Sequence, residues 1–543
     1  MLKRLLYFAP VMLFLVLGAC EAAGRPAMTD EIPPAAAAAV DADADADSDS
    51  AAETAADADA AADAATAPAA APTTRKGKDW PMWGGTPARN QVNLNETNLP
   101  DTWNIETKKN ILWVAELGSR SYGNTVVGGG KVFVGTNNER VRNPKITGDK
   151  GVVMCFNEAD GKFLWQAVHD KLPAGRVNDW PEEGICSSPA VESGRVYYVS
   201  NRCELVCADV EGFLDGENDG PFQTEKYRDP IDGDFIWVLD MMEELTAFPH
   251  NLATSSPLIV GDLIFVLTSN GVDESHITIP APEAPSFIAV DKKTGKVVWE
   301  DDSPGGNILH GQWSNASYGI MGGKRQVVFA GGNGWVYSFE PETGKPIWQF
   351  DCNPKDAKYE LGGRGTRNYI IGTPVIDSDH VYIAVGQDPE HGEGPGHLYS
   401  IDGTASSPLA PPEGTAADIT VTGRTWHYGN KDYHRTLSTV AVHDGLVYAA
   451  DLSGFVNCLD QKTGRVFWKH DLLSAVWGSP TLIDGKVFLG NEDGDVTVFK
   501  PGKEMKIIAV NNMGSSVYGT PIAANGVLYV ANRTKLFAIA KKS

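Results

Sequence analysis

This chain of 543 residues has few basic side chains, no CxxCH motif and no long apolar run, and each of these bears on the function classes open to it. Basic side chains number 46 against 70 acidic ones, which gives a net charge of −24. A chain this acidic argues against nucleic acid as a partner, because phosphate contacts need Lys and Arg. It has no CxxCH motif and therefore no site for a c-type haem. Its apolar run at Leu5–Leu17 is too short to span a bilayer comfortably.

That apolar run instead suits a targeting segment. Lys3 and Arg4 precede it, as is typical of a signal peptide. It ends in Leu17-Gly18-Ala19-Cys20, which resembles the lipobox of bacterial lipoproteins, where the chain is cut before the cysteine and the thiol carries lipid. We therefore predict a lipoprotein signal peptide over residues 1–20, lipidation at Cys20 and attachment to a membrane surface. The alternative is an ordinary secreted protein that is cut near Ala19.

Residues 21–78 are low-complexity sequence rich in Ala, Asp, Pro and Thr. They offer few large side chains to bury and many like charges, so we predict a disordered tether. The first 78 residues carry 12 acidic and 6 basic side chains, which leaves −18 of the −24 on residues 79–543. We predict that residues 79–543 form the folded body.

A turn pattern recurs four times in that body. Each copy has an acidic or amide residue, a Gly four positions later and a Trp eight positions later. Gly permits the positive φ of a tight hairpin, and the Trp then lies in the strand that leaves the turn. The four copies span residues 157–165, 291–299, 340–348 and 460–468.

The strand that enters such a turn ends in a small residue, an apolar residue and often an acid. Eight strands of this kind can be aligned. An alternating strand and a Ser-Pro or Thr-Pro strand start precede most of them. Each unit is thus four short strands, and a period of about 40–50 residues with four strands indicates propeller blades. The last unit lacks a Trp strand, whereas an unpaired one, Ile111–Ala115, precedes the first. We predict an all-β, eight-bladed propeller that this N-terminal strand closes.

The Thr-Gly-Lys-x-x-Trp turns resemble the tryptophan-docking repeats of pyrroloquinoline quinone (PQQ) dehydrogenases. The same repeats occur in the outer-membrane assembly lipoprotein BamB. The opening at Asp79-Trp80-Pro81-Met82-Trp83 is similar to the way such propellers begin. The resemblance covers residues 79–543 and implies that Trp165, Trp299, Trp348 and Trp468 pack between neighbouring blades.

Polar and aromatic residues cluster in the loops that lead into the innermost strands. Such loops surround one mouth of a propeller's axial channel, and convergent polar groups are the usual form of a ligand site. The alternative is a water-filled channel with an ordinary polar rim. The candidate mouth residues are Arg120, Glu183, His250, Asn251, His310, Trp313, Arg364, Arg367, His434 and Trp477.

The resemblance makes PQQ and calcium the cofactors to consider at this mouth. It implies a catalytic Asp, calcium ligands from Glu and Asn, and in many members a disulfide between adjacent cysteines. Glu182 or Glu183 and Asn251 stand in suitable loops. However, the sequence has no adjacent Cys pair, and the loops searched for the Asp offer His310 and two Arg residues instead. We assign no catalytic residue.

Two further loops have metal-ligand chemistry. Asp215, Glu217 and Asp219 are spaced like the first half of an EF-hand calcium loop, although the twelfth position is Lys226. They form either a calcium site or a polar turn. The segment from His391 to His397 carries two His and a Glu, but a hairpin tip is favoured there over a metal site because no helix or strand fixes the side chains.

Together these features favour a non-enzymatic binding or scaffold protein of the cell envelope. Its partners would be the membrane, through the lipid, and envelope proteins, as for BamB. One alternative is a periplasmic PQQ- and calcium-dependent dehydrogenase of alcohols or sugars. Another is a propeller that binds a carbohydrate or other small ligand at the mouth.

Overall fold

The computed structural model describes residues 78–392, 394–412 and 414–542. Cys20, the predicted signal peptide and nearly all of the predicted tether lie outside the described residues. Within these ranges, no helix has the length and apolar character needed to cross a bilayer.

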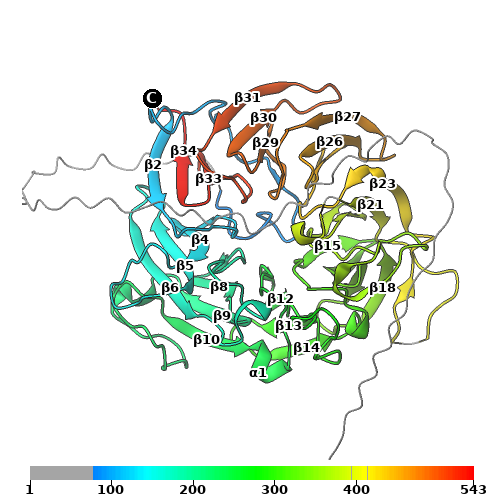
Figure 1. Ribbon diagram of the computed structural model, residues 1–543, viewed down its shortest axis with the longest axis horizontal. Helices are drawn as coiled ribbons and strands as arrows, with labels where there is room; N and C mark the ends of the chain where they lie inside the picture. Colours follow the sequence, from blue (N-terminus) through cyan, green and yellow to red (C-terminus); the bar gives the residue numbers. More distant parts are fainter. Residues whose placement is uncertain (1–77, 393, 413, 543) are drawn as a thin grey trace, which may run out of the picture. The chain divides into compact units, whose positions relative to one another are not determined.

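Eight sheets are arranged around one axis and form an eight-bladed β-propeller, which confirms the predicted all-β fold (Figure 1). In each blade the first strand is innermost and the chain proceeds outward through antiparallel neighbours. Blades 1 to 4 consist of β3 (Val126–Gly128), β4 (Lys131–Asn137), β5 (Lys150–Asn157) and β6 (Phe163–Asp170); β7 (Ala190–Glu192), β8 (Arg195–Val199), β9 (Glu204–Asp209) and β10 (Phe235–Asp240); β11 (Leu258–Val260), β12 (Leu263–Leu267), β13 (Phe287–Asp291) and β14 (Val297–Asp301); and β15 (Ser317–Met321), β16 (Lys324–Ala330), β17 (Trp335–Phe339) and β18 (Pro346–Asp351).

The second half of the ring repeats this order. Blades 5 to 8 consist of β19 (Val375–Asp377), β20 (His380–Val385), β21 (Pro395–Asp402) and β23 (Arg424–His434); β24 (Ala441–His443), β25 (Leu446–Ala450), β26 (Phe455–Asp460) and β27 (Val466–Asp471); β28 (Thr481–Ile483), β29 (Lys486–Gly490), β30 (Asp495–Phe499) and β31 (Ile507–Asn512); and β32 (Ile522–Ala524), β33 (Val527–Ala531), β34 (Lys535–Ile539) and β2 (Ile111–Glu116). The antiparallel pairing of β2 with β34 confirms the predicted closing strand.

Two blades gain a fifth strand from segments outside the repeats. β1 (Val92–Asn93) pairs in parallel with the innermost strand β28, and β22 (Ala417–Asp418) pairs in parallel with the outer strand β18. The only α-helix among the described residues, α1 (Met241–Leu245), is a single short turn after β10.

Tryptophans join neighbouring blades at six of the eight junctions. Each indole N–H donates to a backbone carbonyl in the outer turn of the following blade, and the ring covers a turn glycine at five of them. A Cβ at Gly344, for example, would lie 2.6 Å from the Trp299 ring, so this turn needs glycine for space as well as for its φ of 67°. The six residues are Trp113, Trp165, Trp237, Trp299, Trp426 and Trp468.

Trp348 is the exception among the four tryptophans of the turn pattern. Its indole donates to Gln326 Oε1 at 2.7 Å, within its own blade. The outer turn of the next blade is replaced there by the insertion at 403–423, which carries β22.

The segment at residues 80–93 lies against the innermost strand region of every blade, near the centre of the ring in Figure 1. Its contacts, in blade order, are made by Trp80 with Val127, Pro81 with Val191, Arg89 with Ser256 and Pro257, Pro87 with Tyr318, Ala88 with Ile376, Asn90 with Val442, Gln91 with Leu482 and Asn93 with Ala523. These contacts tie residues 80–93 to all eight blades.

Arg89 is the single charged residue of this segment. Its guanidinium is fully enclosed and donates to the carbonyls of Trp83, Ser256, Pro257 and Ala316 at 2.6–3.0 Å. Burial lowers the pKa of Arg89 to about 9. One side chain thus donates hydrogen bonds to four backbone carbonyls, and no sequence pattern indicates this role.

We expect Arg89→Met to destabilise the propeller by about 3–5 kcal/mol, because it leaves four buried carbonyls without this donor. Arg325→Met is the matched control, since Arg325 forms an exposed ion pair with Glu342 at 2.6 Å and should contribute less than about 1 kcal/mol. Urea unfolding of both variants tests this. Equal midpoints for the two variants would contradict the role assigned to Arg89.

Candidate functional site

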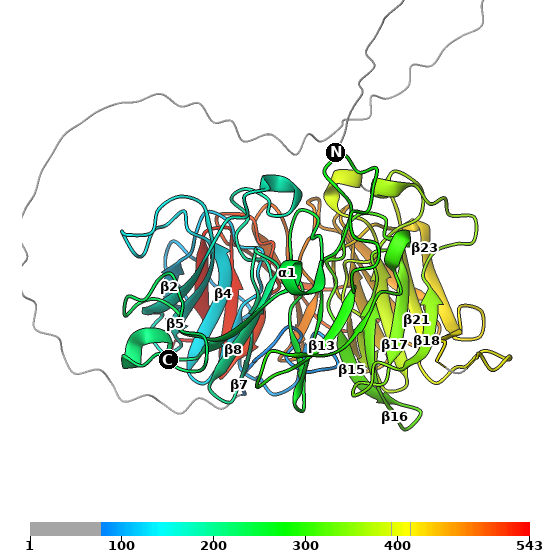
Figure 2. The ribbon, with the colours of Figure 1, turned by 90° about the horizontal axis from the view of Figure 1, so that it is seen from below.

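One face of the ring carries most of the polar loops. Strand direction reverses at each turn, so loops that lead into innermost strands share a face with loops that join the second and third strands of a blade. Figure 2 shows these loops along one side of the molecule. We call this side the loop face.

Charged and aromatic side chains from blades 1, 2, 7 and 8 form the first group on the loop face. Arg120 makes an ion pair with Glu183, and a longer one with Glu182 at 3.8 Å. Beside them, the rings of Tyr122, Trp477 and Tyr518 lie with centroids 4.9–5.7 Å apart. The structure thus brings together three of the predicted mouth residues.

The second group is a cluster of histidines from blades 3 and 4. His250 precedes β11, His276 lies in the loop between β12 and β13, and His310 precedes β15. Their ring centroids are 4.4–4.8 Å apart. His310 Nε2 lies 3.4 Å from His276 Nε2. Trp313 borders the cluster, 5.3 Å from His310 between ring centroids, and its indole donates to the His250 carbonyl at 3.1 Å.

A buried carboxylate, Asp388, supports this cluster from blade 5. Its Oδ2 lies 3.0 Å from His310 Nδ1 and accepts from the Tyr369 hydroxyl at 2.5 Å. Its Oδ1 lies 2.9 Å from His391 Nδ1. His391 Nε2 in turn donates to the carbonyl of Gly362 at 2.6 Å.

These contacts shift the titration of the cluster. Burial, together with the nearby His310, lowers the pKa of His250 to about 3. Burial also lowers the pKa of His276. For Asp388 burial acts in the opposite direction, but hydrogen bonds and charge from His310 and His391 outweigh it and hold the pKa of Asp388 well below its usual range. The carboxylate is therefore ionised at neutral pH.

Glycines let the histidine loops approach this closely. A Cβ at Gly271 would lie 2.7 Å from the His250 Cβ, and a Cβ at Gly362 would lie 2.7 Å from the His276 Cβ. Real Cβ atoms do not approach other atoms so closely, so any other residue at either position would push an imidazole away.

Of the remaining predicted mouth residues, Asn251 and Arg364 lie beside the histidine cluster, whereas Arg367 and His434 pair with carboxylates elsewhere. Asn251 has a φ of 57° and its backbone bonds to Val177 and Trp180 in the preceding loop. Arg364 is exposed, and its positive charge contributes to the lowered pKa of His276. Arg367 pairs with Asp351 at 2.6 Å, and His434 Nδ1 lies 3.2 Å from Asp451.

The predicted calcium loop lies in the insertion between β9 and β10. The Asp215 carboxylate accepts from the Glu217 backbone, and the Asp219 backbone donates to Asp234, both at 2.8–2.9 Å. Among the described residues, these three carboxylates do not bring ligand atoms within 4.8 Å of one another as a set, as the histidines do. The calcium site stays a prediction.

Sequence reasoning missed three residues around the histidine cluster, His276, Tyr369 and Asp388, and considered His391 only together with His397. His276 and Asp388 lie in loops between the second and third strands of their blades, and Tyr369 lies several residues before the start of β19. The segment from His391 to His397 joins the antiparallel strands β20 and β21, and its two histidines take different partners: His391 faces Asp388, whereas His397 lies 3.1 Å from His427 in blade 5. Loops into the innermost strands share one face with the loops between second and third strands. This rule could have located Asp388 and His391 on the loop face.

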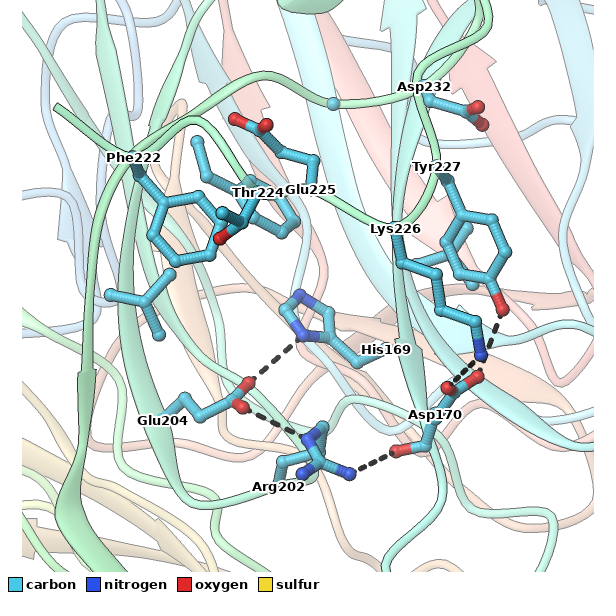
Figure 3. Close-up of a pocket in the computed structure, with 14 residues that line it drawn as sticks. His169, Asp170, Arg202, Glu204, Phe222, Thr224, Glu225, Lys226, Tyr227 and Asp232 are labelled. Atoms are coloured by element: carbon cyan, nitrogen blue, oxygen red, sulfur yellow. Dashed lines mark hydrogen bonds and ion pairs between the residues drawn. The ribbon is translucent and has the colours of Figure 1, made fainter. Parts of the chain in front are cut away.

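A cavity of about 270 Å³ lies at the junction of blades 1 and 2, away from the histidine cluster (Figure 3). His169 lies at its wall, stacked on Phe235, with Nδ1 3.1 Å from Glu204 and Nε2 2.8 Å from the Tyr198 hydroxyl. Glu204 also accepts from Arg202 at 3.0 Å. Both nitrogens of His169 are bonded.

Comparison with known proteins decides the family. The PQQ-like repeat family described as outer membrane protein assembly factor BamB matches residues 94–218, 149–389 and 413–504. The chain belongs to this family. BamB from Moraxella catarrhalis has a similar fold, with 15% identity, a TM-score of 0.46 and coverage of 78% of this chain and 95% of that one.

Two other known proteins are similar to this chain. Quinohemoprotein alcohol dehydrogenase from Comamonas testosteroni is 14% identical, covering 86% of this chain and 81% of that one with a TM-score of 0.46. Tetrathionate hydrolase from Acidithiobacillus ferrooxidans is 24% identical over 278 residues, which is 45% of this chain. The chain matches only 49% of the length of that curated relative. At these identities the likeness concerns the fold, not the chemistry.

The mouth residues do not fit PQQ and calcium. Glu183, the candidate calcium ligand, is paired with Arg120. Asp388, the buried carboxylate of the histidine cluster, is held by two histidines rather than free to act as a base. Cys186 is a lone, half-buried thiol, and none of the six cysteines in the described ranges is in a disulfide.

The Glu204 network predicts a specific acid sensitivity. Burial opposes ionisation, but hydrogen bonds and charge from His169 and Arg202 lower the pKa of Glu204 to about 2. A depressed pKa stabilises the fold above the unfolded value near 4.5, and this contribution is lost as pH falls from there toward 2.

We expect Glu204→Gln to cost on the order of 2–3 kcal/mol at pH 7 and progressively less below pH ~4.5. Urea unfolding as a function of pH measures the difference. Glu342→Gln, at an exposed ion pair with Arg325, is the control and should show no such pH dependence. A pH-independent loss in Glu204→Gln would refute the assigned ionisation.

Proposed function

We propose that this protein is a membrane-anchored binding or scaffold protein of the cell envelope that takes part in outer-membrane protein assembly. The observation that carries the proposal is the match to a family described as an outer membrane assembly factor, which extends over most of the propeller. The predicted lipid at Cys20 would hold it at a membrane surface.

The loop face is the surface we assign to partner binding. Binding residues concentrate on loops that a rigid scaffold positions, and here long loops at 171–189, 268–286 and 352–374 extend one side of the ring. The aromatic trio of Tyr122, Trp477 and Tyr518 beside Arg120 supplies the residue types enriched in protein interfaces. The pairing of Glu183 with Arg120 supports binding rather than quinone chemistry.

The direct test is affinity purification of the full-length lipidated chain from solubilised envelope membranes of its own cells. We expect the barrel-assembly machinery to co-purify, and Trp477→Ala to reduce the yield of that machinery. Lys462→Ala, in an outer hairpin turn remote from the loop face, is the control. A folded, membrane-bound bait that recovers no assembly component would overturn the proposal.

Titration with PQQ and calcium separates this proposal from a quinoprotein dehydrogenase. Because the candidate calcium ligand is already paired and the cysteine is single, we expect no change in the thermal unfolding temperature of the full-length chain. A saturable, calcium-dependent rise would instead favour the dehydrogenase, and dye-linked oxidation of alcohols and sugars would then be measured.

A further inference from the structure

We propose that His250, His276 and His310 form a binding site for one divalent first-row transition-metal ion of the zinc and copper class. One ring nitrogen from each residue lies within 4.8 Å of the others. The three side chains come from three separate loops of blades 3 and 4. Their convergence is therefore a product of the fold and not of a local sequence motif.

His250 has one ring nitrogen committed and one unused. Its Nδ1 donates to the carbonyl of Val272 at 2.8 Å, and a carbonyl can only accept. In the neutral ring Nε2 therefore carries the lone pair. This Nε2 is completely buried and has no hydrogen-bond partner. Leaving a buried polar atom unpaired costs about 1–3 kcal/mol, which a metal bond at Nε2 would remove.

His310 is oriented in the same manner. Its Nδ1 faces the Asp388 carboxylate at 3.0 Å and donates to it, so in the neutral ring Nε2 carries the lone pair. That Nε2 lies 3.4 Å from His276 Nε2. Two nitrogens bound to one tetrahedral zinc at 2.0–2.1 Å lie about 3.3–3.4 Å apart. The pair already has the spacing of two metal ligands.

Asp388 acts as a positioning residue for this site. A metal-binding His commonly donates its other ring nitrogen to a carboxylate or a backbone carbonyl, which fixes the ring and raises its basicity. Asp388 accepts this hydrogen bond from His310, and the Val272 carbonyl accepts it from His250. Asp388 is itself fixed by the Tyr369 hydroxyl at 2.5 Å and by His391.

The neighbouring set of His310, Asp388 and His391 is a weaker candidate. His391 has both ring nitrogens bonded, Nδ1 to Asp388 and Nε2 to the carbonyl of Gly362. Its nitrogens are therefore in use, whereas His250 Nε2 is not. We assign His391 to the support of Asp388 rather than to the metal.

The donor set selects the class of ion. Three imidazoles without a coordinating carboxylate suit zinc, copper and nickel, whereas calcium and magnesium require oxygen ligands. Neutral imidazoles leave the ion its positive charge, and His276 is only half-buried, so a further ligand can approach from that side. The site would exist whether or not the propeller takes part in barrel assembly.

The test is metal binding by the purified full-length chain, in mild detergent and without a polyhistidine tag. After removal of metals with a chelator, we expect one equivalent of Zn²⁺ to bind in competition with a chromophoric chelator. Copper should bind more tightly, and Ca²⁺ and Mg²⁺ should not compete. Co²⁺ should give the visible absorption of a nitrogen-bound tetrahedral ion.

Two variants remove single ligands with little effect on the fold. His276→Asn suits the φ of 58° at that position, because Asn tolerates left-handed backbone. His250→Asn can keep the donor to Val272 while it removes Nε2. Each should weaken zinc binding by about 100-fold or more, because each removes one of three ligands. Asp388→Asn should weaken it by about 10–100-fold yet keep the Co²⁺ spectrum.

His427→Asn is the matched control. His427 and His397 form a second histidine pair, with nitrogens 3.1 Å apart, but they lack a third imidazole. This variant should bind zinc like the wild type. Failure of the folded wild-type chain to bind zinc with 1:1 stoichiometry would overturn the proposal. So would His276→Asn and His250→Asn proteins with wild-type affinity, since any binding would then be adventitious.

Discussion

The stability of a propeller depends on the closure of its ring. Each blade packs only on its two neighbours, so one open junction leaves two exposed sheets. This chain closes the ring twice with its N-terminal region. β2 completes the last blade by pairing with β34, and residues 80–93 bond to the innermost strand region of all eight blades. Arg89 secures the second closure through four buried carbonyls.

The precision of the candidate site depends on that closure. His250, His310 and Asp388 belong to three different blades and are separated by as many as 138 residues of chain between the first and the last. Contacts of 3–5 Å between them persist only if the blades hold fixed positions. The tryptophans between blades and the axial segment provide that rigidity, while the glycines at 271 and 362 let the loops meet.

Much of the fold could be predicted from the sequence because the repeats encode it. The Gly and Trp of each turn contact each other across a blade junction, so their spacing recurs, and the unpaired strand at Ile111 already indicated closure. Trp237 and Trp426 were missed because insertions separate each one from the strand that precedes it. Arg89 was missed because its partners are backbone carbonyls, which leave no pattern in side chains.

The site could be predicted only in part, for the same reason. His250, His310 and Trp313 were found because they precede recognisable strand starts. His276, Asp388 and His391 lie in loops inside blades 3 and 5, and only the three-dimensional arrangement places those loops beside the others. No sequence pattern indicated that Glu183 would form an ion pair with Arg120.

The most direct test of this account is anomalous X-ray diffraction at the zinc edge from crystals of the full-length protein grown with one equivalent of Zn²⁺. The account predicts one strong peak bounded by His250, His276 and His310, about 2.0–2.1 Å from each coordinating nitrogen. A zinc peak elsewhere on the loop face, or three histidines joined only by hydrogen bonds in zinc-containing crystals, would contradict it.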